Sequence, residues 1–202
     1  MRTRARFVFG TQVCTSLTEG GGADREWLCS DGTGGYAMGT VAGLRTRRQH
    51  GLLVTADRKV ALLTLDPVVT LTSGARVELA VHEWASGAIA PQGHQLLESF
   101  DLTDGVPRWR WQVGDVVLER EIVAVHGSPA VVVVHRLVRA PQPVRLELAA
   151  LATWRDAHGE RSGDGAPGPA RRTRRRSRAA DAAPDRRPTR TPPSPRPPRA
   201  GR

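Results

Sequence analysis

A basic segment that ends in a histidine, Arg45-Thr46-Arg47-Arg48-Gln49-His50, is the part of the sequence best equipped to bind a polar ligand. Guanidinium and imidazole groups donate hydrogen bonds to hydroxyl oxygens and pair with carboxylates. The same residues also fit a solvated strand end that binds nothing. From residue types alone, both interpretations stay open.

A second candidate is the glycine-rich loop Asp31-Gly32-Thr33-Gly34-Gly35-Tyr36, because closely spaced glycines can cradle a phosphate. The dinucleotide-binding pattern needs a third glycine where Ala37 stands, and a P-loop needs a lysine where Thr40 stands. Both phosphate motifs therefore fail. We predict a tight turn between strands, in which glycine supplies positive φ.

The tryptophans allow two interpretations, which are stacking on sugar rings and packing in a core. Trp109 and Trp111 alternate on one face of a predicted strand and could form a stacking platform. For any single tryptophan, core packing is the favoured interpretation, because a large aromatic side chain mostly serves to bury area. The same choice applies to the other three, Trp27, Trp84 and Trp154.

The other reactive side chains form no catalytic or metal motif. The histidines lack H-E-x-x-H spacing and the chain has no C-x-x-C, so we expect no metal site and no cofactor. No G-x-S-x-G elbow is present, and the scattered acids cannot be paired for acid–base chemistry from sequence alone. Cys14 and Cys29 are expected to be free, buried thiols.

Charge and hydrophobicity divide the chain near residue 158. The formal net charge is +10, and residues 159–202 hold 13 arginines against 4 acids, 9 of the 15 prolines and no large apolar side chain. Such a segment cannot offset the entropy that ordering costs. We therefore expect residues 1–158 to form one domain and residues 159–202 to be a disordered Arg/Pro/Ala-rich tail.

The tail has two further interpretations. Its arginines could hold nucleic acid or an anionic surface, which makes a basic-tail binding protein the alternative function. Against this, the tail has no aromatic residue on which bases would stack. A GC-rich gene read out of frame also yields this mixture of Arg, Pro, Ala and Gly.

No segment directs the chain to a membrane. No apolar run approaches the ~20 residues of a membrane-spanning helix. The apolar stretch behind the basic N-terminus is only Phe7-Val8-Phe9, too short for a secretory signal. We expect a cytoplasmic protein with no membrane partner.

Alternation of apolar and polar residues predicts antiparallel strands throughout residues 1–158. It is clearest in 143–150 and in 108–113 and 116–123, which Gly114-Asp115 joins as a hairpin. A further strand is predicted over 130–138, and its unbroken valines 131–134 indicate that it is covered on both faces. Many short strands separated by turn signals predict an all-β fold, an antiparallel β-sandwich. The remaining predicted strands are 7–14, 52–55, 62–71 and 76–81.

Four blocks of motifs follow one another along residues 23–158. They are 25–28 with 31–40 and 46–54; Pro91-Gln92-Gly93 with 97–100; 109–113 with 118–120; and 143–146 with Arg155, Asp156 and His158. In this order and spacing they resemble the N-terminal domain of bacterial and archaeal-type glycogen debranching enzymes, the amylo-α-1,6-glucosidase family.

The resemblance implies a supersandwich-like β-domain that precedes a catalytic barrel of paired helices. In the family, that barrel carries the acids that hydrolyse α-1,6 branch linkages during glycogen breakdown. Because the resemblance ends near His158, we expect a truncated piece that lacks its barrel partner, has no assigned catalytic residue and is inactive alone. Such a piece would expose an apolar patch.

The resemblance also implies α-glucan or glycogen as the ligand, bound through residues of the matched blocks that suit sugar hydroxyls. These residues are Tyr36, Arg47, Arg48, His50 and Gln92, with Trp109 as a stacking candidate.

Overall fold

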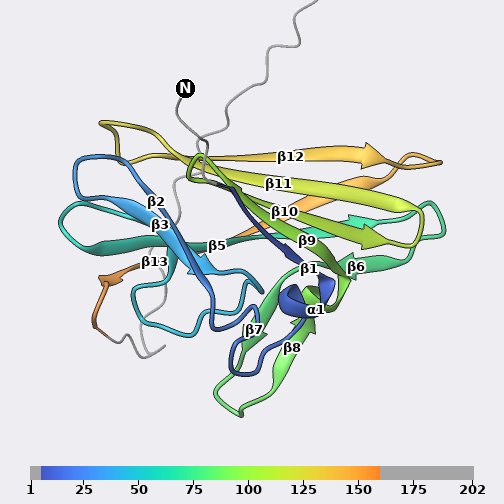
Figure 1. The fold of residues 1–202 in the computed structure, drawn as a ribbon, viewed down its shortest axis with the longest axis horizontal. Coiled ribbons are helices and arrows are strands. Elements are labelled where there is room, and N and C mark those ends of the chain that lie inside the picture. The colour runs from blue at the N-terminus through green and yellow to red at the C-terminus, as the bar shows by residue number, and fades with distance from the viewer. Residues whose placement is uncertain (1–5, 160–202) are drawn as a thin grey trace, which may run out of the picture. The chain divides into compact units, whose positions relative to one another are not determined.

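Two antiparallel β-sheets lie face to face in the computed structural model, which describes residues 6–159 (Figure 1). The first sheet has the strand order β1-β9-β10-β11-β12. The architecture is the all-β sandwich that the alternation predicts, and the hairpin at Gly114 joins β10 to β11 as expected. The strands of this sheet are β1 (Arg6–Gly10), β9 (Leu97–Thr103), β10 (Val106–Val113), β11 (Val116–Ala124) and β12 (Val131–Arg139).

The second sheet has the order β13-β5-β4-β3-β2, and a short strand, β6, pairs with the far end of β5. Separate from both sheets, β7 (Val81–Glu83) and β8 (Ile89–Gln92) form a small hairpin. The strands of the second sheet are β2 (Glu26–Ser30), β3 (Tyr36–Thr40), β4 (Gly51–Val54), β5 (Lys59–Thr70), β6 (Arg76–Glu78) and β13 (Arg145–Asp156).

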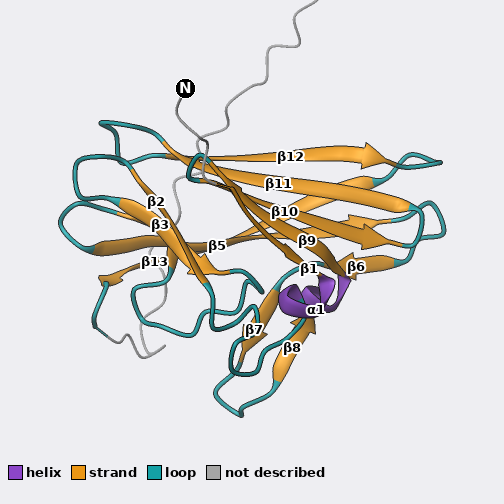
Figure 2. Ribbon diagram, in the orientation of Figure 1, coloured by secondary structure: helices purple, strands orange, loops and turns teal. Residues whose placement is uncertain are grey.

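Three predicted strands differ from the structure. The predicted strand 76–81 is divided, because β6 ends at Glu78 and β7 begins at Val81. Residues 11–14 form a short helix, α1 (Thr11–Cys14), instead of the second half of a strand (Figure 2). The partner of β1 explains this difference. Gly10 pairs with Ser99, and β9 has only two residues before Ser99 with which the antiparallel β1 could continue to pair. A single 3-10 turn, Gly93–Leu96, leads into β9.

The valine-rich strand β12 is also not covered on both faces. It forms an edge of the first sheet, where Val131 and Val133 face the core while Val132 and Val134 are 47% and 40% exposed. The prediction failed because an unbroken valine run is the same in a covered strand and in an edge strand. Whether the strand is covered or lies at an edge depends on the order of strands in the sheet, which the valine run does not reveal.

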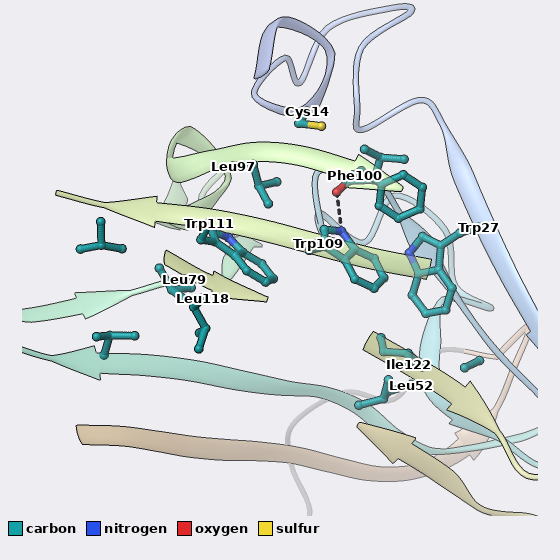
Figure 3. Close-up of a cluster of buried hydrophobic side chains, with 14 of the residues drawn as sticks. Cys14, Trp27, Leu52, Leu79, Leu97, Phe100, Trp109, Trp111, Leu118 and Ile122 are labelled. Carbon is teal, nitrogen blue, oxygen red and sulfur yellow. Dashed lines mark hydrogen bonds between the residues drawn. The ribbon is translucent and has the colours of Figure 1, made fainter. Parts of the chain in front are cut away.

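Aromatic side chains fill the space between the sheets (Figure 3). The ring of Trp109 meets the rings of Trp27 and Phe100 edge-on, each at a centroid distance of 5.1 Å. Trp109 and Trp111 are 1% and 2% exposed, so the predicted stacking platform is wrong and the core interpretation is confirmed for both. By contrast, Trp84 is 55% exposed.

The two cysteines are free and buried, as predicted. Burial raises the pKa of the Cys14 and Cys29 thiols to about 11, so both stay protonated at neutral pH. Within residues 6–159, no helix is both long and apolar enough to cross a membrane. The predicted disordered tail lies, from residue 160 onward, outside the described residues.

Candidate functional site

The loop 41–50 joins β3 to β4 and carries three of the predicted sugar-binding residues. Its first half is anchored, because the buried Ala42 and Leu44 pack against Val81 of β7. Its second half, residues 46–48, is exposed. The loop therefore presents its arginines from a fixed base.

His50 sets the shape of the exposed half of the loop. The Nδ1 atom accepts hydrogen bonds from the backbone amides of Thr46 and Arg47, at 3.2 and 3.4 Å. Nε2 therefore carries the proton and donates a hydrogen bond to Glu26 Oε1 at 2.8 Å. Burial lowers the pKa of His50, although Glu26 opposes that shift, and the imidazole stays neutral.

The burial of His50 corrects one prediction. Its side chain is 0% exposed, so the ring cannot touch a sugar directly. Its three polar contacts all serve the loop and the neighbouring strand β2. His50 is thus a positioning residue for the arginines beside it.

Arg47 is held in place while its side chain remains exposed. Its Nε lies 2.7 Å from Oε1 of Glu26, the same oxygen that accepts the hydrogen bond from His50. The Arg47 side chain is nevertheless 58% exposed. A guanidinium with one edge fixed by a carboxylate loses less rotamer freedom when it binds a ligand.

Arg48 lies where the loop meets the end of β13. Its backbone carbonyl accepts a hydrogen bond from Arg155 Nη2 at 2.6 Å. The Nη1 atom of Arg155 also donates to the carbonyl oxygens of Asp156, Ala157 and Gly159. Arg155 therefore fastens the exposed loop to the chain that follows β13.

Tyr36 lies at the start of β3, next to the loop. Its half-buried ring packs with Val54 and Val60, and its hydroxyl donates to the Gln49 carbonyl at 3.5 Å, the long limit of a hydrogen bond. Burial raises the pKa of Tyr36, against the charges of Arg58 and Arg155. The phenol is therefore neutral and remains a donor.

Gln92 and Trp109 lie apart from this group. Gln92 ends β8, where its side chain bonds to the Ile89 carbonyl and to Gln95. Both of these partners lie in the segment 89–95 and not in the loop 41–50. Trp109 is in the core, and its indole N–H donates to the Val41 carbonyl at 2.8 Å, so the prediction that it stacks on a sugar is wrong.

The glycine-rich loop between β2 and β3 is a structural turn, as predicted. Oδ1 of Asp31 accepts hydrogen bonds from the amides of Thr33 and Gly35, at 2.7 and 2.9 Å. These bonds, led by that from Thr33, lower the pKa of Asp31. Gly32 and Gly34 adopt φ values of 78° and 105°, a region that side chains disfavour.

The exposed half of the loop, with Tyr36 and Arg155, is here called the basic loop surface: Tyr36, Arg47, Arg48 and Arg155. The exposed guanidinium groups there suit hydrogen bonds to hydroxyl or carboxylate oxygens, and the Tyr36 oxygen can accept one from a hydroxyl. Glu26, the acid that contacts Arg47, is also bonded to His50. Within residues 6–159, no three His, Cys, Asp or Glu side chains gather as metal ligands.

Sequence reasoning missed two members of this arrangement, Glu26 and Arg155. Both stand in motif blocks of the sequence, but Glu26 is 24 residues from His50, and Arg155 is 107 residues from Arg48. Only the pairing of β2 with β3 and of β13 with β5 brings them to the loop. Within one sequence, no local signal marks them as partners.

Comparison with known proteins gives one match. A family model described as the glycogen debranching enzyme N terminal matches residues 25–191, which is 167 of the 202 residues. The matched range includes the whole basic loop surface, and it continues past His158, where the resemblance seen in the sequence ends. Neither a curated protein nor a solved structure matches the chain.

Proposed function

This chain belongs to the family of glycogen debranching enzyme N-terminal domains, and on that premise we propose that it binds α-glucan through the basic loop surface. The family match is the observation that carries the proposal. The resemblance makes glucan the expected ligand, and the loop offers the exposed donors that sugar hydroxyls require.

The arrangement of the loop supports this role in one physical respect. Arg47 is fixed by Glu26, and the loop amides are fixed by His50, before any ligand arrives. Ordering flexible side chains costs about 0.5–1.5 kcal/mol each on binding. A loop that is already ordered avoids part of that cost and can hold a neutral, weakly attracting ligand.

Affinity electrophoresis in gels that contain branched α-glucan tests the proposal. We expect glucan to retard the full chain, and the Arg47→Ala/Arg48→Ala variant to bind about tenfold more weakly, which corresponds to about 1.4 kcal/mol. Arg76→Ala/Arg139→Ala is the matched control, because it removes two exposed arginines elsewhere and equally lowers the net charge. Equal retardation of the two double variants would refute the assignment of the loop.

We propose further that this chain assists hydrolysis without performing it. Glycoside hydrolysis needs a carboxylic acid that stays protonated near neutral pH, which requires a raised pKa. Among residues 6–159, every acid with a resolved shift has a lowered pKa: Asp31, Asp66, Asp101, Glu147 and Asp156. Release of reducing sugar from branched dextrin by the purified chain would overturn this proposal.

The outer surface of β12 supports the proposed partner, a catalytic helical-barrel domain. Val132 and Val134 are 47% and 40% exposed there, on one edge strand. Exposed apolar clusters of this kind are typical of interfaces. We assign this surface to contact with the barrel, and its exposure in the chain alone predicts self-association.

A further inference from the structure

A half-buried arginine faces the interior of the sandwich with its charge unpaired. Arg120 projects inward from β11 between the buried Leu118 and Ile122. Its Cζ lies 4.4 Å from the Trp109 ring centroid and 5.1 Å from that of Trp111, so indoles cover the guanidinium. Within residues 6–159, no ion pair of 4.0 Å or less and no hydrogen bond holds its side chain.

The charge on Arg120 persists in this position. Burial lowers its pKa to about 10, against the attraction of Asp66, so the guanidinium stays protonated at neutral pH. Asp66 does not pair with it, because the carboxylate oxygens of Asp66 accept from Thr64 and bond to His82 instead. A charge that is partly shielded from water and has no ion-pair partner is costly, and an anion bound beside it would lower that cost.

A cavity lies beside this arginine. Its volume is about 60 Å³, and it is lined by residues of both sheets and of β7, among them Arg45, Asp66, His82, Trp111 and Arg120. Three buried polar atoms of this lining have no hydrogen-bond partner: the donors Trp111 Nε1 and Arg120 Nε, and His82 Nδ1. The two arginines outnumber the single carboxylate, so the lining is positive.

We propose that this cavity binds one small oxyanion group, a carboxylate or a phosphate, between Arg120 and the indole N–H of Trp111. A planar guanidinium that stacks on indoles keeps its donor edge free for two oxygens. The volume excludes a sugar ring, since even benzene occupies a cavity of about 150 Å³. The site is therefore distinct from the proposed glucan surface.

Thermal unfolding of the full chain at pH 7 tests the site directly. Inorganic phosphate and acetate are titrated separately, with chloride at the same ionic strength as the reference. We expect a saturable rise in Tm with phosphate or acetate beyond that with chloride, because a ligand that binds only the folded state stabilises it. The ion whose effect saturates at the lower concentration shows whether the site prefers a phosphate or a carboxylate. Equal, unsaturable effects of all three ions would overturn the proposal and leave a cavity that holds water.

Variants separate the cavity from the arginines of the tail, which also attract anions. Arg120→Gln should abolish the saturable rise in Tm, and Trp111→Phe, which keeps a ring but removes the N–H, should weaken the anion about tenfold. Arg139→Gln, an exposed residue of β12, should bind the anion unchanged. If Arg120→Gln fails to fold, Trp111→Phe decides. Saturation that is unaltered in Trp111→Phe would refute the site.

Discussion

At the scale of single residues, His50 links the shape of the loop 41–50 to the stability of the sheet. Its two nitrogens serve three partners, which are two loop amides and Glu26 on β2. Because the side chain is fully buried, its removal would leave a cavity and deprive the two loop amides of their acceptor. One side chain therefore supports both the fold and the proposed binding surface.

Replacement of His50 should be costly. We expect His50→Ala to lower the free energy of unfolding by about 2–4 kcal/mol, because it leaves a cavity and strips the loop amides of their acceptor. Urea unfolding followed by circular dichroism measures this change. His158→Ala is the control, since that exposed side chain should cost less than about 0.5 kcal/mol. Equal losses in both variants would contradict the account.

His135, which faces Arg120 from β12, should make stability depend on pH. Burial, and then the charge of Arg120, lower its pKa from 6.5 to about 4. Between these values the unfolded chain binds more protons than the folded one, so stability falls as the pH falls. Burial also lowers the pKa of His50 and His94, which adds the same sign.

We expect His135 to account for about 1–2 kcal/mol of the stability lost between pH 7 and pH 5, since its partial exposure weakens the full linkage value. In urea unfolding at both pH values, His135→Gln should lose less stability than the unchanged chain. His158→Gln should show the original dependence. An unaltered slope in His135→Gln would show that its pKa is not lowered.

At this scale, the sequence predicted the role of a residue where its partners are close to it in the chain. The turn at Asp31 was predictable, because its bonds run to amides two and four residues away. The burial of His50 was not predictable, because a polar side chain at the end of a loop suits the surface or the core, and core packing of Trp109 was predicted without its partners. Their positions depend on partners in distant strands, such as Glu26 for His50 and Phe100 for Trp109.

At the scale of elements, the turn between β2 and β3 depends on backbone geometry that only glycine adopts cheaply. Gly34 has φ of 105°, and space for a Cβ is available, with Ala56 Cβ at 3.6 Å. Any cost of Gly34→Ala would therefore come from the backbone and not from a steric clash.

We expect Gly34→Ala to destabilise the fold by about 1–2 kcal/mol. Gly10→Ala is the matched control, because Gly10 has φ of −87° and open space around its Cβ position. Chemical denaturation of both variants decides the point. If the two variants are equally stable, the turn does not depend on positive φ at Gly34.

The edge strand β12 gives a sharper test, since neighbouring valines face opposite ways. Val133 packs against the core, whereas Val134 is 40% exposed and lies opposite Glu121 of β11. Val133→Lys should cost about 2–4 kcal/mol, because it buries a charge. Val134→Lys should change stability by less than about 0.5 kcal/mol, gain a cross-strand partner in Glu121, and reduce aggregation.

Urea unfolding and static light scattering of the two lysine variants measure these effects. Similar destabilisation by both would contradict the assignment of the two faces of β12. Unchanged scattering for Val134→Lys would contradict the assignment of this edge as the self-associating surface.

At the scale of the whole molecule, the alternating pattern sufficed to predict the architecture but not its connections. The hairpin of β10 and β11 is local and was predicted together with its turn at Gly114. The pairings of β1 with β9 and of β5 with β13 join distant segments and leave no trace in a single sequence. The basic loop surface depends on the second of these pairings, through Arg155.

The central claim, that α-glucan binds the basic loop surface, is tested most directly by hydrogen exchange of the full chain with and without branched glucan. The account predicts slower amide exchange in residues 45–51, in moderate salt as in low salt, because the ligand carries no charge. Unchanged exchange in that segment while glucan is bound, or protection confined to another surface such as β12, would contradict the account.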